Sequence, residues 1–128
     1  MVTAEQIMTQ EVLFVSPDAS ILDVVRILTD KRISGLPVAD RDRKLVGVIT
    51  EKDVLKLLFE DDAKTRFVKD FMTCGATAFK TTDTIDVICR YFIKSTVRRV
   101  PILNNRDELV GIISRRDIIA EIKRIKGI

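Results

Sequence analysis

The sequence predicts an α/β (α+β) fold in which one β-α-β-β-α unit occurs twice along the chain. The first observation is an internal repeat without gaps, found when the sequence is shifted by 64 positions. The matched residues include Gly, Pro and Asp as well as apolar residues; they are Met8-Thr9 with Met72-Thr73, Pro37 with Pro101, Leu45-Val46-Gly47 with Leu109-Val110-Gly111, and Asp53 with Asp117. Shared hydrophobic periodicity would match apolar residues alone, so the repeat indicates one supersecondary unit in two copies, residues 1–64 and 65–128.

Local patterns in the first copy give the order of its elements. Val12–Val15 is a short run of β-forming residues that ends at a Ser-Pro-Asp turn. A helix capped by Ser20 is predicted to run to about Lys31, because apolar residues follow at the i, i+3, i+4 and i+7 spacing. A strand begins at Leu36, and after a polar turn a second strand covers Leu45–Thr50. A last helix is predicted over Glu51–Phe59.

The second copy repeats this order. Thr84 is the expected cap of a helix that runs to Lys94, with apolar residues along one face. Strands are predicted over Val100–Leu103 and Leu109–Ser114, joined by a polar turn. Arg115–Lys126 is predicted to be the closing helix.

Composition limits the class of protein. The chain has 128 residues, 46% of them hydrophobic and 32% charged, which is typical of a globular domain. Each copy alone would be of marginal size for a stable core, so we expect the two to pack together. The net charge of +3 is small and does not favour nucleic acid. No apolar run is long enough to cross a membrane and no signal sequence opens the chain, so a cytoplasmic location is expected.

The same composition argues against catalysis and metal binding. The chain has no histidine, which removes most routes to acid–base or triad catalysis at neutral pH. Its two cysteines, Cys74 and Cys89, are too far apart for a CxxC motif and are expected to be reduced. We therefore predict no catalytic residues, no metal site and no catalytic cofactor.

The first long helix in each copy has a wide apolar face. Residues 21–28 place apolar side chains over roughly 220° of the helix, whereas one core needs about 100° or somewhat more. Residues 85–93 are similar. A deeply buried helix would account for this width, and so would a second buried face against another subunit. The second reading predicts a homodimer formed by the Ser20–Lys31 and Asp83–Lys94 helices and the two closing helices.

Each copy ends its last strand with the same polar signature, a hydroxyl residue three positions before an aspartate. Thr50 precedes Asp53 in the first copy and Ser114 precedes Asp117 in the second. One interpretation is a capping box at the start of the following helix. The other is a ligand-binding site, because a carboxylate can accept hydrogen bonds from the two hydroxyls of a ribose, and a helix N-terminus favours phosphate. The pattern alone leaves both open.

These residues make the chain resemble a tandem pair of CBS motifs, a Bateman module. The matching segments are Met8-Thr9, Ser16-Pro17-Asp18-Ala19-Ser20-Ile21, Gly35-Leu36-Pro37-Val38 and Leu45-Val46-Gly47-Val48-Ile49-Thr50 with Asp53, then Met72-Thr73, Val100-Pro101-Ile102 and Leu109-Val110-Gly111-Ile112-Ile113-Ser114 with Asp117. The resemblance implies two motifs packed with pseudo-twofold symmetry, which commonly dimerise. It also implies that adenosine-containing ligands (AMP, ADP, ATP, S-adenosylmethionine or NAD) bind in clefts between the motifs.

The resemblance further implies two sets of ligand-binding residues, each drawn from both motifs. The first set is Thr50, Asp53, Ala76, Thr77, Val97, Arg98, Arg99, Pro101 and Arg116. The second set is Ser114, Asp117, Val12, Leu13, Ile33, Ser34, Gly35, Pro37 and Lys52. Arginines in the first set suit phosphate, whereas the second set has only Lys52 as a cation. The chain departs from the family pattern at Arg99, which stands where the first copy has a glycine.

The predicted function is that of a stand-alone regulatory protein that senses an adenine nucleotide and signals to an unknown protein partner without catalysis. The alternative is a protein- or nucleic-acid-interaction module whose ligand clefts are vestigial. Its best support is the basic segment Lys123-Arg124-Ile125-Lys126. Those cations also suit a helix C-terminus, where they offset the helix dipole.

Overall fold

A computed structural model describes residues 1–128, and the chain divides into two compact units that are described one at a time. One unit is Leu13–Ala76. The other joins Met1–Val12 to Thr77–Ile128. The units therefore differ from the sequence copies, because the first twelve residues of the first copy belong with most of the second copy.

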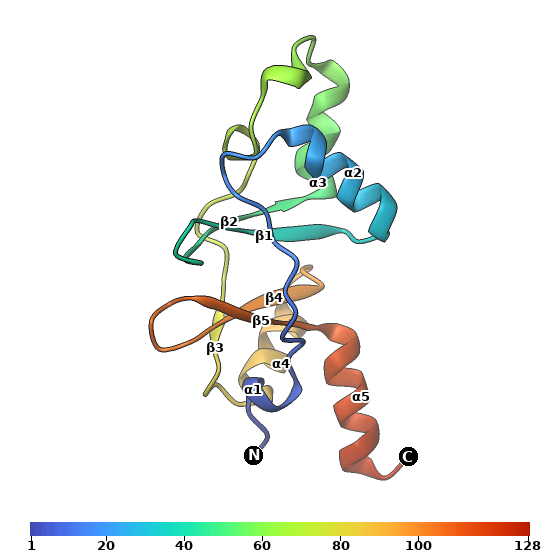
Figure 1. Cartoon of the computed structure of the whole chain (residues 1–128). Coiled ribbons are helices and arrows are strands. Elements are labelled where there is room, and N and C mark those ends of the chain that lie inside the picture. The colour runs from blue at the N-terminus through green and yellow to red at the C-terminus, as the bar shows by residue number, and fades with distance from the viewer. The chain divides into compact units, whose positions relative to one another are not determined.

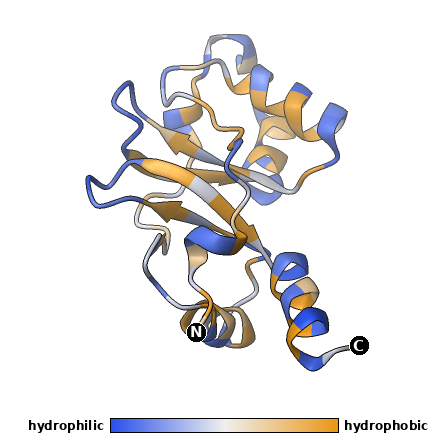
Figure 2. Ribbon diagram, turned by 60° about the horizontal axis from the view of Figure 1, so that its bottom comes forward, coloured by the Kyte–Doolittle hydropathy of each residue, from blue (hydrophilic) through white to orange (hydrophobic).

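The unit Leu13–Ala76 is built on a hairpin of β1 (Gly35–Ala39) and β2 (Leu45–Thr50). The strands are antiparallel, and Gly35 lies opposite Thr50. Asp40 closes the turn because its carboxylate accepts the N–H groups of Asp42 and Lys44, both at 2.9 Å. Figure 2 shows this turn and its counterpart in the other unit as hydrophilic loops joined to hydrophobic strands.

Helix α2 (Ile21–Lys31) covers the hairpin and supplies the core. Ser20 caps its start by accepting the Leu22 N–H at 3.2 Å. The helix ends at Arg32, which adopts a left-handed conformation with φ 54°. Ile21, Val24 and Leu28 are buried, together with Leu36, Val38, Ile49 and other apolar residues of the unit.

The first closing helix is shorter than predicted. Helix α3 covers only Glu51–Val54 and continues as a 3₁₀ helix over Leu55–Phe59. Two further 3₁₀ turns follow, Ala63–Thr65 and Val68–Asp70. The α-helix predicted over 51–59 is therefore wrong beyond its first turn.

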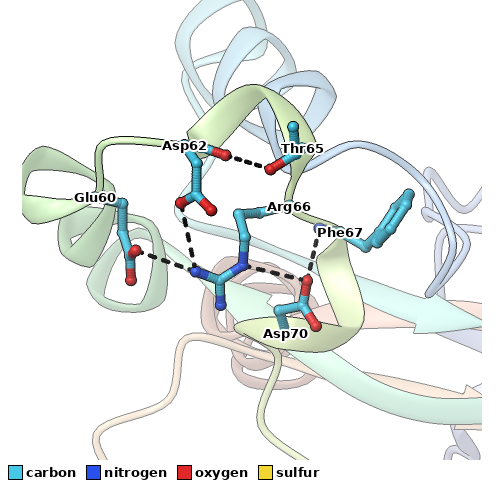
Figure 3. A network of polar contacts seen from close by, with 6 residues as sticks. All are labelled: Glu60, Asp62, Thr65, Arg66, Phe67 and Asp70. Atoms are coloured by element: carbon cyan, nitrogen blue, oxygen red, sulfur yellow. Dashed lines mark hydrogen bonds and ion pairs between the residues drawn. The ribbon is translucent and has the colours of Figure 1, made fainter.

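Arg66 organises the connector after this helix (Figure 3). Its guanidinium donates to Glu60 at 3.0 Å, lies 3.5 Å from Asp70 and 3.9 Å from Asp62, and covers the ring of Phe71 at 4.9 Å. The Asp70 carboxylate also accepts the Phe67 N–H at 2.9 Å. This backbone hydrogen bond, assisted by Arg66, lowers the pKa of Asp70.

The second unit contains a three-stranded sheet in the order β3-β4-β5. Its strands are β3 (Phe79–Lys80), β4 (Arg99–Leu103) and β5 (Leu109–Ser114). β3 is parallel to β4, and β4 is antiparallel to β5. In the other unit the residue equivalent to Phe79 is Val15, which makes only an isolated parallel bridge to Val38. The strand predicted over Val12–Val15 is thus reduced to one bridge.

Three helices complete this unit. Helix α1 (Ala4–Ile7), which the patterns did not predict, lies beside α4 (Ile85–Lys94) in Figure 1, and the Ala4 N–H donates to the Asp83 backbone carbonyl at 2.8 Å. Helix α5 (Arg115–Lys126) has the predicted bounds and ends at Gly127, with φ 66°. The core gathers Ala4, Ile85, Ile88, Phe92, Val100, Ile102, Ile113 and Ile118.

The repeated Met-Thr dipeptides explain how the copies exchange segments. Thr73, from the second copy, pairs with Val48 on β2, with N–H···O distances of 2.9 and 2.8 Å. Thr9, from the first copy, pairs with Ile112 on β5 at 2.9 and 3.1 Å. The glycines of the repeat allow this close approach: a Cβ on Gly47 would meet the Thr73 carbonyl at 2.7 Å, and one on Gly111 would collide with Met8.

The α/β fold class predicted from the sequence is confirmed, with both sheets mixed with helices. None of the helices has the length and apolar character needed to cross a membrane.

Candidate functional site

The first hydroxyl–aspartate pair lies where β2 ends and α3 begins. The Asp53 Oδ2 atom accepts the Thr50 N–H at 2.9 Å and the Thr50 hydroxyl at 3.1 Å. Its Oδ1 atom lies 3.5 Å from the Thr73 hydroxyl, at the long limit of a hydrogen bond. Asp53 is buried, with 8% of its surface exposed. The pair thus forms a capping box.

The second pair has the same geometry at the junction of β5 and α5. The Asp117 Oδ2 atom accepts the Ser114 N–H at 2.7 Å and its hydroxyl at 3.0 Å. The Asp117 N–H in turn lies 3.2 Å from Ser114 Oγ. Asp117 is half-buried, and its Oδ1 atom has no hydrogen-bond partner in the structure. This copy is also a capping box.

The capping role of each aspartate leaves part of its carboxylate able to accept further hydrogen bonds. A carboxylate has about four lone-pair positions, and each capping box occupies the two on Oδ2. The Oδ1 atom keeps both of its positions in Asp117 and is only weakly engaged in Asp53. The two interpretations of the signature are therefore compatible, because the cap fixes the carboxylate and leaves one oxygen able to accept from a ligand.

The segment before each strand proline lies against the start of the closing helix in the same unit. The Ser34 carbonyl accepts the Glu51 N–H at 2.9 Å, and Gly35 lies opposite Thr50. In the other unit the Arg98 carbonyl accepts the Arg115 N–H at 3.0 Å, and Arg99 lies opposite Ser114. Each unit thus brings together members of both predicted sets.

The presence of Arg99 in place of glycine has a local explanation. A Cβ on Gly35 would lie 3.3 Å from the γ-methyl group of Thr50 and 3.0 Å from the Ile49 carbonyl. Ser114, opposite Arg99, has no γ-methyl group. The second copy therefore removes one of the two atoms that crowd this position in the first.

The cations of the predicted sets are exposed. Arg98, Arg99 and Arg116 lie at the start of β4 and the first turn of α5, and their guanidinium groups have no hydrogen bond or ion pair in the structure. Lys52, on α3, is also exposed. The structure therefore leaves all four side chains able to bind an anion.

The remaining predicted residues divide between the units. Leu13, Ile33, Pro37 and Ala76 belong to the unit 13–76, and Val12, Thr77, Val97 and Pro101 belong to the other. Pro37 and Pro101 are buried within their strands, whereas Leu13, Thr77 and Val97 are exposed.

Two residues with notable contacts were absent from the predicted sets. Thr73 is the contact of Asp53 described above, and the repeated Met-Thr dipeptide was the sequence signal for it. Arg115 donates to three backbone carbonyls at the end of α4. No repeat signal marks Arg115, because the equivalent residue in the first copy is Glu51. Across the structure no three His, Cys, Asp or Glu side chains gather as a metal site would require.

Comparison with known proteins identifies the repeated unit. The sequence profile of the CBS domain matches residues 4–60 and 68–124. An inosine-5'-monophosphate dehydrogenase of Methanocaldococcus jannaschii is 36% identical over 116 residues, which are 91% of this chain and 23% of the relative. The chain thus spans about a quarter of that enzyme. The protein MJ1426 of the same organism is 27% identical, with 84% of this chain and 83% of MJ1426 covered.

Solved structures agree with this match. The structure of CBSX2 in complex with AMP has a TM-score of 0.87 at 29% identity and covers 98% of this chain and 99% of its own. A second structure of this CBS-pair protein, from Arabidopsis thaliana, has a TM-score of 0.88 at 26% identity, with 98% and 97% covered. MJ1225 of Methanocaldococcus jannaschii shares the fold, with a TM-score of 0.87 at 21% identity over 97% of this chain and 51% of that one.

Proposed function

The chain belongs to the CBS-domain family, as two CBS domains in tandem, and on that basis we propose that it is a regulatory module that senses an adenosine-containing ligand. The observation that carries the proposal is the pair of capping-box aspartates, each fixed through Oδ2 and each with an Oδ1 atom still able to accept from ribose. The likeness to CBSX2, solved with AMP, supports the ligand class. The proposal includes no catalytic step and places the protein in the cytoplasm.

The proposed binding residues are the two sets that the resemblance implies. In the first, Asp53 accepts from ribose and Arg98, Arg99 and Arg116 bind phosphate. In the second, Asp117 accepts from ribose and Lys52 is the cation. The absence of any ion pair on these cations supports the assignment, because a bound phosphate would not have to displace a carboxylate. AMP, ADP and ATP fit this chemistry; S-adenosylmethionine and NAD stay within the proposal as other adenosine compounds.

A homodimer is also part of the proposal. Val87 and Ile93 on α4, and Ile119, Ile122 and Ile125 on α5, are exposed apolar side chains that burial against a second copy would remove from water. We expect sedimentation at tens of micromolar protein to show a dimer. A monomer under those conditions would contradict this part of the proposal and leave the ligand part standing.

Thermal denaturation with added nucleotides tests the ligand directly. A ligand that binds only the folded state stabilises it by about 2.7 kcal/mol at a hundredfold excess over its dissociation constant. AMP or ATP should therefore raise the melting temperature by several degrees, while CTP should not. Equal shifts of the melting temperature with ATP and CTP would mean that the protein recognises the phosphate groups and not the base. Mass spectrometry of small molecules released from the purified protein would then identify the ligand that it retains.

The interaction module with vestigial clefts predicts a different result. In that case no adenine compound would change the melting temperature, and a short DNA or RNA at the same salt concentration would. Its support is the basic end of α5, but Lys123, Arg124 and Lys126 also lie in the last turn of that helix, where cations offset the dipole. The nucleotide and oligonucleotide arms of one experiment therefore separate the two functions.

A further inference from the structure

The end of α4 is held by a side chain from another element. The Arg115 guanidinium donates through Nε to the Val97 carbonyl at 2.8 Å and through Nη2 to the Ser95 and Phe92 carbonyls at 2.7 and 3.2 Å. It also lies over the Phe92 ring, at 5.9 Å from the centroid. The Arg115 N–H adds a fourth hydrogen bond, to the Arg98 carbonyl at 3.0 Å. One residue thus fixes the backbone from Phe92 to Arg98.

Helix α4 does not end on the left-handed residue that is common at a helix C-terminus. Its C-cap, Ser95, is extended (φ −118°, ψ 170°) rather than left-handed. The Ser95 hydroxyl is buried without a hydrogen-bond partner, so the loop does not anchor itself through its own side chain. Arg115 supplies a donor to the Phe92 carbonyl in the last turn of α4 and to the Ser95 and Val97 carbonyls that follow it.

In the first copy, the equivalent helix ends without such a side-chain contact. Helix α2 ends at Arg32 in the left-handed conformation, and the residue equivalent to Arg115 is Glu51, a carboxylate that cannot donate to carbonyls. Only the backbone hydrogen bond is common to both copies, from the Glu51 N–H to Ser34 and from the Arg115 N–H to Arg98. The loop that leads to β4 therefore has a side-chain clamp that the loop leading to β1 lacks.

We infer that Arg115 is a positioning residue that holds the Ser95–Arg98 loop in shape so that Arg98 and Arg99 meet the phosphate of a bound nucleotide. The inference rests on the proposed function and adds a difference between the two sets of binding residues: the set that contains Arg98 and Arg99 is preorganised, and the set that contains Ser34 and Gly35 is less so. Ordering a loop before binding removes an entropic cost from the binding step. All of Arg115's observed contacts are to protein, so its effect on a ligand is indirect.

The test uses Arg115→Lys, which keeps the positive charge but loses the planar guanidinium that reaches several carbonyls at once. Dissociation constants for adenosine and ATP would be measured by calorimetry, and amide hydrogen exchange at residues 96–98 by mass spectrometry. We expect ATP to bind about five- to tenfold more weakly, with adenosine changed by less than about twofold, since only the phosphate contacts lose their preorganised support. Exchange at 96–98 should become faster.

Two further variants keep the inference falsifiable. Glu51→Gln is the matched control, because it changes the equivalent position of the first copy and should alter neither the ratio of adenosine to ATP affinity nor exchange at 96–98. Ser95→Gly loosens the same loop while keeping Arg115, and should also weaken ATP more than adenosine. If Arg115→Lys exchanges faster but binds ATP as the wild type does, Arg115 is only a helix cap and the inference is wrong. If the wild type binds no adenine compound at all, the proposed function fails with it.

Discussion

The closing helices of the two copies begin alike and end differently. Both start with a capping box, yet α3 stops at Val54 whereas α5 continues to Lys126. The sequences differ most at the far end, where the first copy has the carboxylates of residues 60–62 and the second has three cations followed by Gly127. Carboxylates at a helix C-terminus oppose its dipole, and cations with a left-handed glycine favour it.

The carboxylates of the first copy have another use. Arg66 gathers Glu60, Asp62 and Asp70 and so fixes the connector that leads to the second Met-Thr dipeptide (Figure 3). In the second copy the cation and the carboxylate lie on the helix itself: Arg124 donates to Glu121 from one turn away at 2.8 Å and lowers the pKa of that carboxyl. The comparison teaches that the repeat keeps the start of the closing helix, whereas the charges near its end make different contacts in the two copies.

The largest expected effect on ligand binding concerns the two aspartates that the copies share. Asp53→Ala and Asp117→Ala each remove the N3 carboxylate of a capping box, so both should lower the free energy of unfolding, by about 1 kcal/mol. If the aspartates also bind ribose, Asp53→Ala should weaken adenosine, AMP and ATP by similar factors in its own site, on the order of tenfold to a hundredfold. Calorimetry of the two variants, with the melting temperature measured in parallel, separates the roles.

Arginine variants provide the contrast within one set. Arg98→Ala or Arg99→Ala should leave adenosine binding unchanged and weaken ATP most, and the loss should shrink as salt rises. Asp117→Ala should leave the affinities of the Asp53 site as they were. An Asp53→Ala protein that melts earlier but binds every ligand normally would show that Asp53 acts as a cap alone.

The second prediction concerns the glycines that admit the Met-Thr segments. A methyl group at Gly47 would meet the backbone carbonyl of Thr73, whereas one at Gly111 would meet the side chain of Met8. Gly47→Ala should therefore cost about 2–3 kcal/mol and Gly111→Ala about 1–2 kcal/mol, since a side chain yields more easily than a paired backbone. Urea denaturation of both variants would measure the difference.

A double-mutant cycle sharpens this comparison. Met8→Ala should relieve much of the cost of Gly111→Ala, because it removes the two nearest of the colliding atoms, Sδ and Cγ, and the coupling energy should be large. Met72→Ala should give little relief to Gly47→Ala, because the Thr73 carbonyl remains in place. Equal coupling energies in the two copies would mean that the Thr73 segment moves aside to admit the methyl group. The pairing of Thr73 with β2 would then be less rigid than its hydrogen bonds indicate.

Local signals in the sequence were enough for much of this fold. The bounds of β2, β5 and α5 agree with prediction, because each is set by a turn, a hydroxyl cap or a C-terminal glycine within a few residues. Helix α1 was missed although Thr3 and Gln6 carry a capping-box signature, since the helix is only four residues long.

The features that escaped prediction depend on contacts distant in sequence. The repeat marked both Met-Thr dipeptides but could not say that each pairs with the last strand of the other copy. The capping boxes followed from the residues, whereas the clamp of Arg115 on the end of α4 required the fold to bring the two together. How the ligand-binding sets pair is likewise a matter of tertiary structure, and it stays a prediction.

The smallest expected effect is a pH dependence that the two units share for different reasons. The pKa of Asp70 is lowered chiefly by the Phe67 N–H, with help from Arg66, and that of Asp86 chiefly by the Thr84 hydroxyl. A carboxyl whose pKa is lower in the folded state stabilises the fold above its ordinary value of 3.8, and this contribution is lost as pH falls through the folded-state pKa. The free energy of unfolding should therefore fall as pH drops below about 4.

Single variants assign this pH dependence to the two units. Asp70→Asn and Asp86→Asn should each flatten the fall in unfolding free energy below pH 4, measured by urea denaturation along a pH series. Salt should distinguish them, because the part of the Asp70 effect that comes from Arg66 is a solvent-accessible charge interaction and is screened, whereas the hydroxyl hydrogen bond to Asp86 is not. At high salt the Asp70 contribution to the fall in unfolding free energy below pH 4 should therefore become smaller in the wild type. The Asp86 contribution should stay the same. A wild-type profile that salt leaves unchanged would mean that Asp70 is held by its backbone hydrogen bond alone, and that the Arg66 cluster of the first copy orders the connector without adding to the pH dependence.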